Sequence, residues 1–77
     1  MNVAKVFGEV LRDMRIEAGM TQEQLGLEAD LRRTFISLLE LGQQQPTLTT
    51  LVKLSGALRC PAHELIAKFE AVYHQEN

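Results

Sequence analysis

The chain has 77 residues, which suffices for one folded domain spanning residues 1–77 and excludes two independent domains. It carries 8 Lys and Arg against 10 Asp and Glu, a formal net charge of -2, so it lacks the overall basic balance that favours phosphate binding. The single cysteine excludes an intramolecular disulfide, and because no leader or long apolar run is found we expect a cytoplasmic chain without a membrane segment.

The first half of the chain begins with apolar residues at three- and four-residue steps, which predict an amphipathic helix over residues 3–14. Gly19 follows as a left-handed cap. Thr21, with Gln24 three residues later, has the form of a capping box. We therefore expect a second, short helix from about Thr21, ended by Asp30, because aspartate is one of the few non-glycine types that tolerates a positive φ.

The second half of the chain predicts three more helices. Helical spacing resumes over residues 32–41 and stops at Gly42. Thr47 is a good N-cap for a fourth helix over residues 48–58. A fifth is expected over about 61–74, with fraying from residue 74 onward. No stretch alternates with period two, so the expected fold is all-α with five helices.

The segment over about residues 21–41 is the most informative part of the pattern. It holds two short helices joined by three or four residues, and arginines stand at the start of the second. This is the arrangement of a helix-turn-helix, which sets its second helix in the major groove of DNA. Gly26 is expected where the two helices approach, and Ile36 and Leu39 are expected to close the corner in the core.

Three strings carry a resemblance to a known family: Thr21-Gln22-x-x-Leu25-Gly26, Arg33-Thr34-Phe35-Ile36-Ser37-x-x-Glu40-x-Gly42 and Pro46-Thr47-Leu48. Together they resemble the Xre/Cro-type, lambda-repressor-like regulators over about residues 6–66. The short length and the Arg-Thr-Phe-Ile-Ser string further resemble the controller proteins of restriction-modification systems. The resemblance implies a compact lambda-repressor-like domain and a sequence-specific transcriptional regulator that binds double-stranded DNA.

The resemblance also implies a DNA-facing set at the start of the second helix, on the third helix and in the loop after it: Gln22, Arg32, Arg33, Thr34, Phe35, Ser37, Leu38, Gln43 and Gln44. Gln22 would meet a phosphate at a helix N-terminus, and Arg32 would pair with another. Arg33 would contact a guanine edge in bidentate fashion. Leu38 would touch a thymine methyl group or else belong to the core. Phe35 would pack on the second helix or lie along the sugars, and we favour packing.

The family pattern further matches Arg15 and Glu40 to a structural ion pair between the first and third helices. The chain departs from that pattern at Asp30 and Arg59, which stand where glycine is common, so both are expected in a left-handed conformation. In the loop after the third helix, glutamines replace the family's Lys or Arg. We therefore expect few neutralised phosphates and a shallow salt dependence for one subunit.

The fifth helix is expected to serve dimerisation. Such a small core rarely supplies more than about 3–5 kcal/mol, so self-association is a common remedy. The helix carries more apolar residues than a small core needs, namely Ile66, Phe69, Val72 and Tyr73. The alternative is one wide core stripe. A two-fold homodimer would place its recognition helices about 34 Å apart and would predict a pseudo-palindromic operator.

Other functional signals are weak. Cys60 and His63 have a metal-like spacing but lack a second ligand pair, so we expect no metal. No nucleophile motif or phosphate loop is present, and we expect neither catalysis, cofactor nor small-molecule ligand. Two alternatives to a controller protein stay open: an antitoxin of a toxin-antitoxin module, and a domain of the same fold used for protein contacts without DNA binding.

Overall fold

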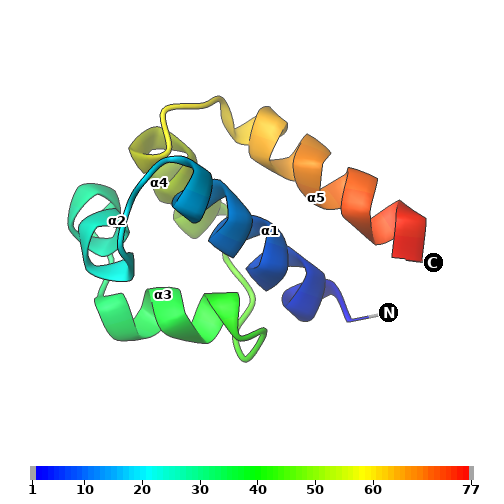
Figure 1. Cartoon of the computed structure of the whole chain (residues 1–77), viewed down its shortest axis with the longest axis horizontal. Helices are drawn as coiled ribbons and strands as arrows, with labels where there is room; N and C mark the ends of the chain where they lie inside the picture. Colours follow the sequence, from blue (N-terminus) through cyan, green and yellow to red (C-terminus); the bar gives the residue numbers. More distant parts are fainter. Residues whose placement is uncertain (1, 77) are drawn as a thin grey trace.

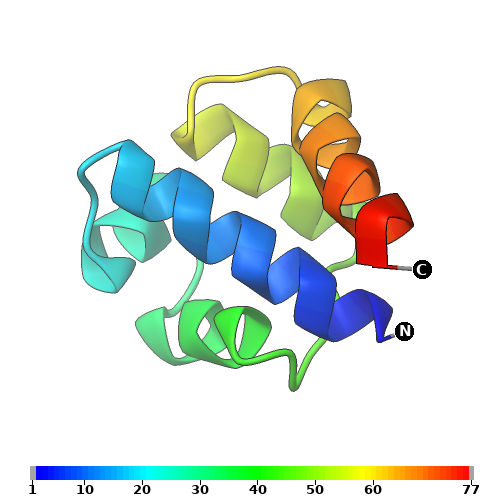
Figure 2. The ribbon, with the colours of Figure 1, turned by 45° about the vertical axis from the view of Figure 1, so that its right-hand side comes forward.

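The computed structural model describes residues 2–76, with side chains to residue 75, and within that range it contains five helices and no strand. These are α1 (Val3–Glu17), α2 (Gln22–Ala29), α3 (Arg33–Glu40), α4 (Leu48–Ala57) and α5 (Ala62–Glu76). α1 lies in the middle, with α3 on one side and α5 on the other (Figures 1 and 2). α2 packs on α3 and α4, and α4 packs on α5. The all-α, five-helix prediction is confirmed.

Three helices begin at side-chain caps. The Thr21 hydroxyl accepts from the Gln24 N–H at 3.0 Å, and the Gln24 side chain accepts from the Thr21 N–H at 2.8 Å, which completes the predicted capping box. Thr47 accepts from the backbone of Thr50 at 3.1 Å, as its position before α4 predicts. Asn2 caps α1 by accepting from the Lys5 N–H at 3.2 Å, a cap that the sequence analysis did not identify.

The helix ends differ from the predicted ones at two places. α1 continues to Glu17, beyond the predicted residue 14, and ends in the turn where Gly19 has a φ of 72°. α5 continues to Glu76, so the expectation of fraying is wrong for residues 74–76. Residue 77 lies outside the described range. Aromatic contacts support this last turn, since the ring of Tyr73 lies 5.4 Å from Phe69 and 5.7 Å from His74.

The core forms where the five helices meet, and its largest fully buried side chains are Val6, Leu11, Leu25, Ile36, Leu39, Leu54 and Leu65. Ile36 and Leu39 are therefore the closing residues that the pattern predicts. Four apolar residues of the predicted helical stripes stand in solvent instead: Val3 is 42%, Leu41 is 63%, Leu48 is 77% and Val52 is 58% exposed. α4 packs on α2 and α5, and two of its apolar residues, Leu48 and Val52, stay exposed.

Candidate nucleic-acid interface

The turn between α2 and α3 consists of Asp30, Leu31 and Arg32. Asp30 has the predicted left-handed conformation, with φ 56° and ψ 47°, and the Leu31 N–H donates to the Gly26 carbonyl at 2.8 Å. A Cβ at position 26 would lie 2.7 Å from the Leu31 carbonyl oxygen, which is backbone and cannot move aside. Gly26 is therefore required for the close approach, and the short turn directs α3 across α2.

The start of α3 is its most exposed part. Arg32, Arg33 and Thr34 all lie in solvent, whereas the opposite side of the helix buries Ile36 and Leu39. Neither arginine forms an ion pair with any residue of the described range. Arg32 is the N-cap but makes no side-chain cap bond, so its side chain does not satisfy the first N–H groups of α3. Two free guanidinium groups and a helix N-terminus make this end attractive to anions.

The middle of α3 is intermediate in exposure. Phe35 packs against the core cluster, which agrees with the favoured interpretation of packing. Ser37 and Leu38 are half-buried, and Leu38 does not belong to that cluster. Ser37 follows Arg33 by four residues and Leu38 follows Thr34 by four, so on a helix each lies on the same side as that earlier residue. The structure places a hydroxyl group and an aliphatic group behind the charged start of the helix, and Gln43 and Gln44 follow in solvent.

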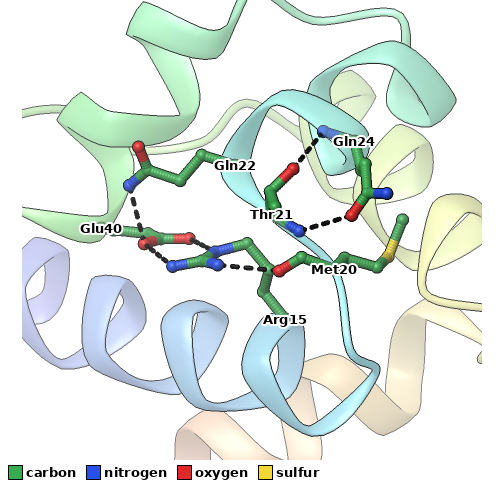
Figure 3. A network of polar contacts seen from close by, with 6 residues as sticks. All are labelled: Arg15, Met20, Thr21, Gln22, Gln24 and Glu40. Carbon is green, nitrogen blue, oxygen red and sulfur yellow. Dashed lines mark hydrogen bonds and ion pairs between the residues drawn. The ribbon is translucent and has the colours of Figure 1, made fainter.

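A polar network joins α1, α2 and α3 (Figure 3). Arg15 donates to Glu40 through Nε at 2.6 Å and Nη2 at 3.0 Å, and through Nη1 to the Met20 carbonyl at 2.9 Å. Only 11% of the Arg15 side chain and 3% of the Glu40 side chain are exposed. The hydrogen bonds that Arg15 donates to Glu40 raise the pKa of Arg15 above its ordinary value, against the opposing effect of burial. The network ties the end of α3 to the end of α1.

Gln22 takes part in the same network, which the sequence analysis did not anticipate. Its amide Nε2 donates to Glu40 Oε1 at 3.1 Å, and in Figure 3 its amide oxygen points away from that carboxylate. Gln22 is the first residue of α2, so its backbone N–H has no partner within the helix. A phosphate at this site would meet the backbone N–H and the second amide hydrogen, while Glu40 holds the side chain in place.

Glycines set the position of α3 on α1. A Cβ at Gly8 would lie 2.3 Å from the Leu39 carbonyl oxygen and 2.7 Å from that of Glu40, so the two backbones touch. Gly42, at φ 75°, ends α3 in the left-handed conformation and lies beside Lys5, where an added Cβ would be 2.8 Å from the Lys5 Cα. No motif had drawn attention to Gly8. The sequence offers one signal for it: Gly8 lies seven residues, or two helical turns, before Arg15, so both lie on the same side of α1.

The predicted dimerisation residues on α5 are all half-buried. Phe69 and Val72 pack on the core cluster, and the ring of Phe69 lies 6.4 Å from that of Phe7. Ile66 and Tyr73 do not belong to that cluster. The chain itself thus covers part of the stripe and leaves part of it accessible.

Charges elsewhere are arranged differently from the start of α3. Lys53 lies 3.8 Å from the carboxylate of Asp30, whose side chain is 97% exposed, so that pair is weak. Arg59 has the expected left-handed conformation, with a φ of 59°.

Burial raises the pKa of the Cys60 thiol, helped by the nearby Glu64, so the thiol stays protonated near neutral pH. Within the described range, no three His, Cys, Asp or Glu side chains gather as metal ligands, and no helix could span a membrane.

Comparison with known proteins adds independent findings. A family model described as helix-turn-helix matches residues 11–65. The control protein C.BamHI of Bacillus amyloliquefaciens is 36% identical over 66 residues, which cover 84% of this chain and 82% of that protein. The control protein C.MunI of Mycoplasma sp is 35% identical over 72 residues, covering 91% and 97%. The solved structure of the restriction-modification controller protein C.AhdI from Aeromonas hydrophila superposes with a TM-score of 0.78 at 34% identity, over 80% of this chain and 94% of that one.

Proposed function

This chain belongs to the helix-turn-helix family, and from that premise we propose that it is a DNA-binding transcriptional regulator of the restriction-modification controller type. It would bind a short pseudo-palindromic operator as a homodimer. The observation that carries the proposal is the start of α3, where Arg32, Arg33 and Thr34 stand in solvent and neither arginine has an ion-pair partner among the described residues. Relatives described as control or controller proteins do not favour the antitoxin or the purely protein-binding alternative.

The proposed interface divides its residues by task. Arg33 reads a guanine through O6 and N7, a contact that discriminates by about 1–3 kcal/mol. Arg32, at the N-cap, pairs with a phosphate, and Gln22 binds another through the start of α2. Thr34, Ser37 and the exposed part of Leu38 complete the surface that enters the groove. Gln43 and Gln44 donate hydrogen bonds to phosphate without neutralising it.

The net charge of -2 is compatible with this proposal because only the surface that meets DNA needs to be basic. Exposed acids stand on α1 and α2, namely Glu9, Asp13, Glu17, Glu23 and Glu28. The two arginines at the start of α3 have no acidic partner within the described range. A dimer doubles this small positive surface, and its DNA ligand implies a cytoplasmic location in a bacterial cell.

The decisive experiment selects fragments of bacterial genomic DNA on the purified protein and on Arg33→Ala. We expect the wild type to enrich a symmetric motif and Arg33→Ala to relax one position in each half-site, because the guanine contact is lost. Lys68→Ala, an exposed cation on α5, is the matched control and should enrich the wild-type motif. No enrichment by the wild type would contradict DNA binding, and an unchanged motif with Arg33→Ala would contradict the role of Arg33.

The dimer is tested separately by equilibrium sedimentation. The accessible parts of Ile66 and Tyr73 on α5 form the proposed contact, so Ile66→Lys should give a folded monomer where the wild type is a dimer at micromolar concentration. Far-UV circular dichroism checks that the variant remains folded. A wild type that is monomeric at that concentration, on and off DNA, would remove the dimer from the proposal.

A further inference from the structure

The two ends of α3 carry very different charge. Arg32 and Arg33 stand at its start, whereas the loop after its end exposes three neutral glutamines, residues 43–45. One cation lies beside this loop, and it comes from a distant part of the sequence. Lys5, in the first turns of α1, touches Gly42, where an added Cβ would lie 2.8 Å from the Lys5 Cα and 3.2 Å from its Cβ. Both views show the start of α1 next to the loop (Figures 1 and 2).

The backbone of Lys5 is well held. Its N–H donates to the side chain of Asn2, which caps α1, and the residues on either side of it, Ala4 and Val6, are buried. Contact with Gly42 fixes the same turn against the end of α3. The side chain itself is exposed and forms no ion pair within the described range. The fixed backbone of Lys5 therefore carries a side chain whose ammonium group is free.

The end of α3 does not require that ammonium group as a cap. The carbonyls of Ser37, Leu38 and Leu39 already accept from the N–H groups of Leu41, Gln43 and Gly42 at 2.9–3.1 Å. The remaining carbonyl, that of Glu40, lies against Gly8. Because the chain itself supplies donors to three of these carbonyls and covers the fourth with Gly8, the charge of Lys5 is available to an external anion.

The length of α3 is comparable to the width of the major groove of DNA. α3 has eight residues, which at 1.5 Å each gives a helix of roughly 12 Å, and the major groove is also about 12 Å wide. A helix seated in the groove by its arginine end would carry Lys5 toward the backbone at its other end. We propose that Lys5 is a phosphate-binding residue of the DNA interface and supplies, from α1, the positive charge that residues 43–45 lack.

This inference rests on the proposed function, and salt dependence tests it. Each phosphate neutralised by a cation contributes about 0.9 to the slope of log K against log salt. With the DNA motif that the wild type selects, Lys5→Gln should lower this slope by roughly 1.8 per dimer and weaken binding severalfold at low salt. Lys5→Arg should keep the slope. Lys5→Gln combined with Gln43→Lys should recover it, because the charge returns to the same end of α3.

Lys68→Gln is the matched control, since it removes the same charge from α5 and should leave the slope near that of the wild type. An equal slope for Lys5→Gln and the wild type, on DNA that the wild type binds, would overturn the inference and leave the proposed function intact. An unchanged slope together with a lower thermal midpoint would assign Lys5 to the stability of α3 and overturn it too. A wild type that binds no DNA would overturn the proposed function itself.

Discussion

Arg33 and Glu40 begin and end the same eight-residue helix, yet they stand in opposite surroundings. Arg33 is exposed and unpaired within the described range, whereas Glu40 is buried under Arg15 and Gln22. The start of the helix can therefore change its side chains at little cost to the fold, while the end determines where the helix lies. If the start of α3 reads DNA as proposed, its sequence preference can vary because other residues set the position of the helix.

The largest effect is expected at the buried end. Glu40→Ala strands the guanidinium of Arg15 and removes the partner of Gln22, and breaking such a pair typically costs about 3–5 kcal/mol. Since 1 kcal/mol lowers the midpoint of a domain this size by about 4–8 °C, thermal unfolding followed by circular dichroism should show a partly or fully unfolded variant at 37 °C. The double variant Arg15→Met/Glu40→Leu should recover most of the loss, because no charge is then stranded. A double variant as unstable as the sum of the two single ones would contradict this account.

The second effect concerns Gly8, where α1 and α3 touch through their backbones. Gly8→Ala places a methyl group 2.3 Å from the Leu39 carbonyl, so α3 must move, at a cost of about 1–3 kcal/mol. DNA affinity should fall as well, because the displaced helix carries the reading surface. Gly56→Ala is the matched control: Gly56 lies within α4 with nothing near its added Cβ, and alanine should stabilise the chain by roughly 0.5–1 kcal/mol. Equal midpoints for the two variants would mean that the α1–α3 contact is looser than described.

A smaller gain is expected at Asp30, in the turn that leads into the exposed end. Asp30→Gly relieves a residue at φ 56° and loses only a weak, exposed ion pair with Lys53. We expect stabilisation of roughly 0.5 kcal/mol, since the greater freedom of glycine in the unfolded chain offsets part of the relief. Urea unfolding measures this value. A clear loss of stability would show that the aspartate side chain stabilises the turn.

The smallest effect on stability is expected at the start of α3. The double variant Arg32→Ala/Arg33→Ala removes two exposed side chains that have no partner in the described range. The free energy of unfolding should therefore change by no more than about 0.5 kcal/mol. Loss of DNA binding in this variant would then report contacts with DNA and not unfolding, in contrast to Glu40→Ala. A substantial drop in the thermal midpoint would show that the start of α3 contributes to stability as its end does.

Local signals predicted most of the fold. The capping box at Thr21, the left-handed Asp30 and the N-cap at Thr47 involve residues within a few positions of one another, so short strings suffice to identify them. The family resemblance added a specific pattern across several helices, and the comparisons confirm it. The extension of α5 past residue 74 does not follow from the apolar pattern; its last turns carry the stacked rings of Phe69 and Tyr73 and an edge contact between Tyr73 and His74, which composition does not reveal.

The candidate site was predicted less completely. The arginines at the start of α3 stand out through the helix-turn-helix pattern and the family resemblance, and their exposure agrees with the rarity of burial for charged residues. The bond from Gln22 to Glu40 joins residues 18 positions apart, and no local pattern points to it. The exposure of Leu48 and Val52 was also unexpected, since periodicity shows that a helix has an apolar face without showing whether another element covers it.

The sequence by itself determined the five helices, the caps at Thr21 and Thr47, the tight turn before α3 and the exposed arginines that begin it. These depend on backbone preferences and short-range hydrogen bonds, which act between near neighbours. Only the tertiary structure decided that Gly8 sets α3 against α1, that Gln22 is held by Glu40, and that Lys5 lies at the far end of the reading helix. Contacts of that kind depend on how helices cross, and the crossing is settled by packing of the whole core.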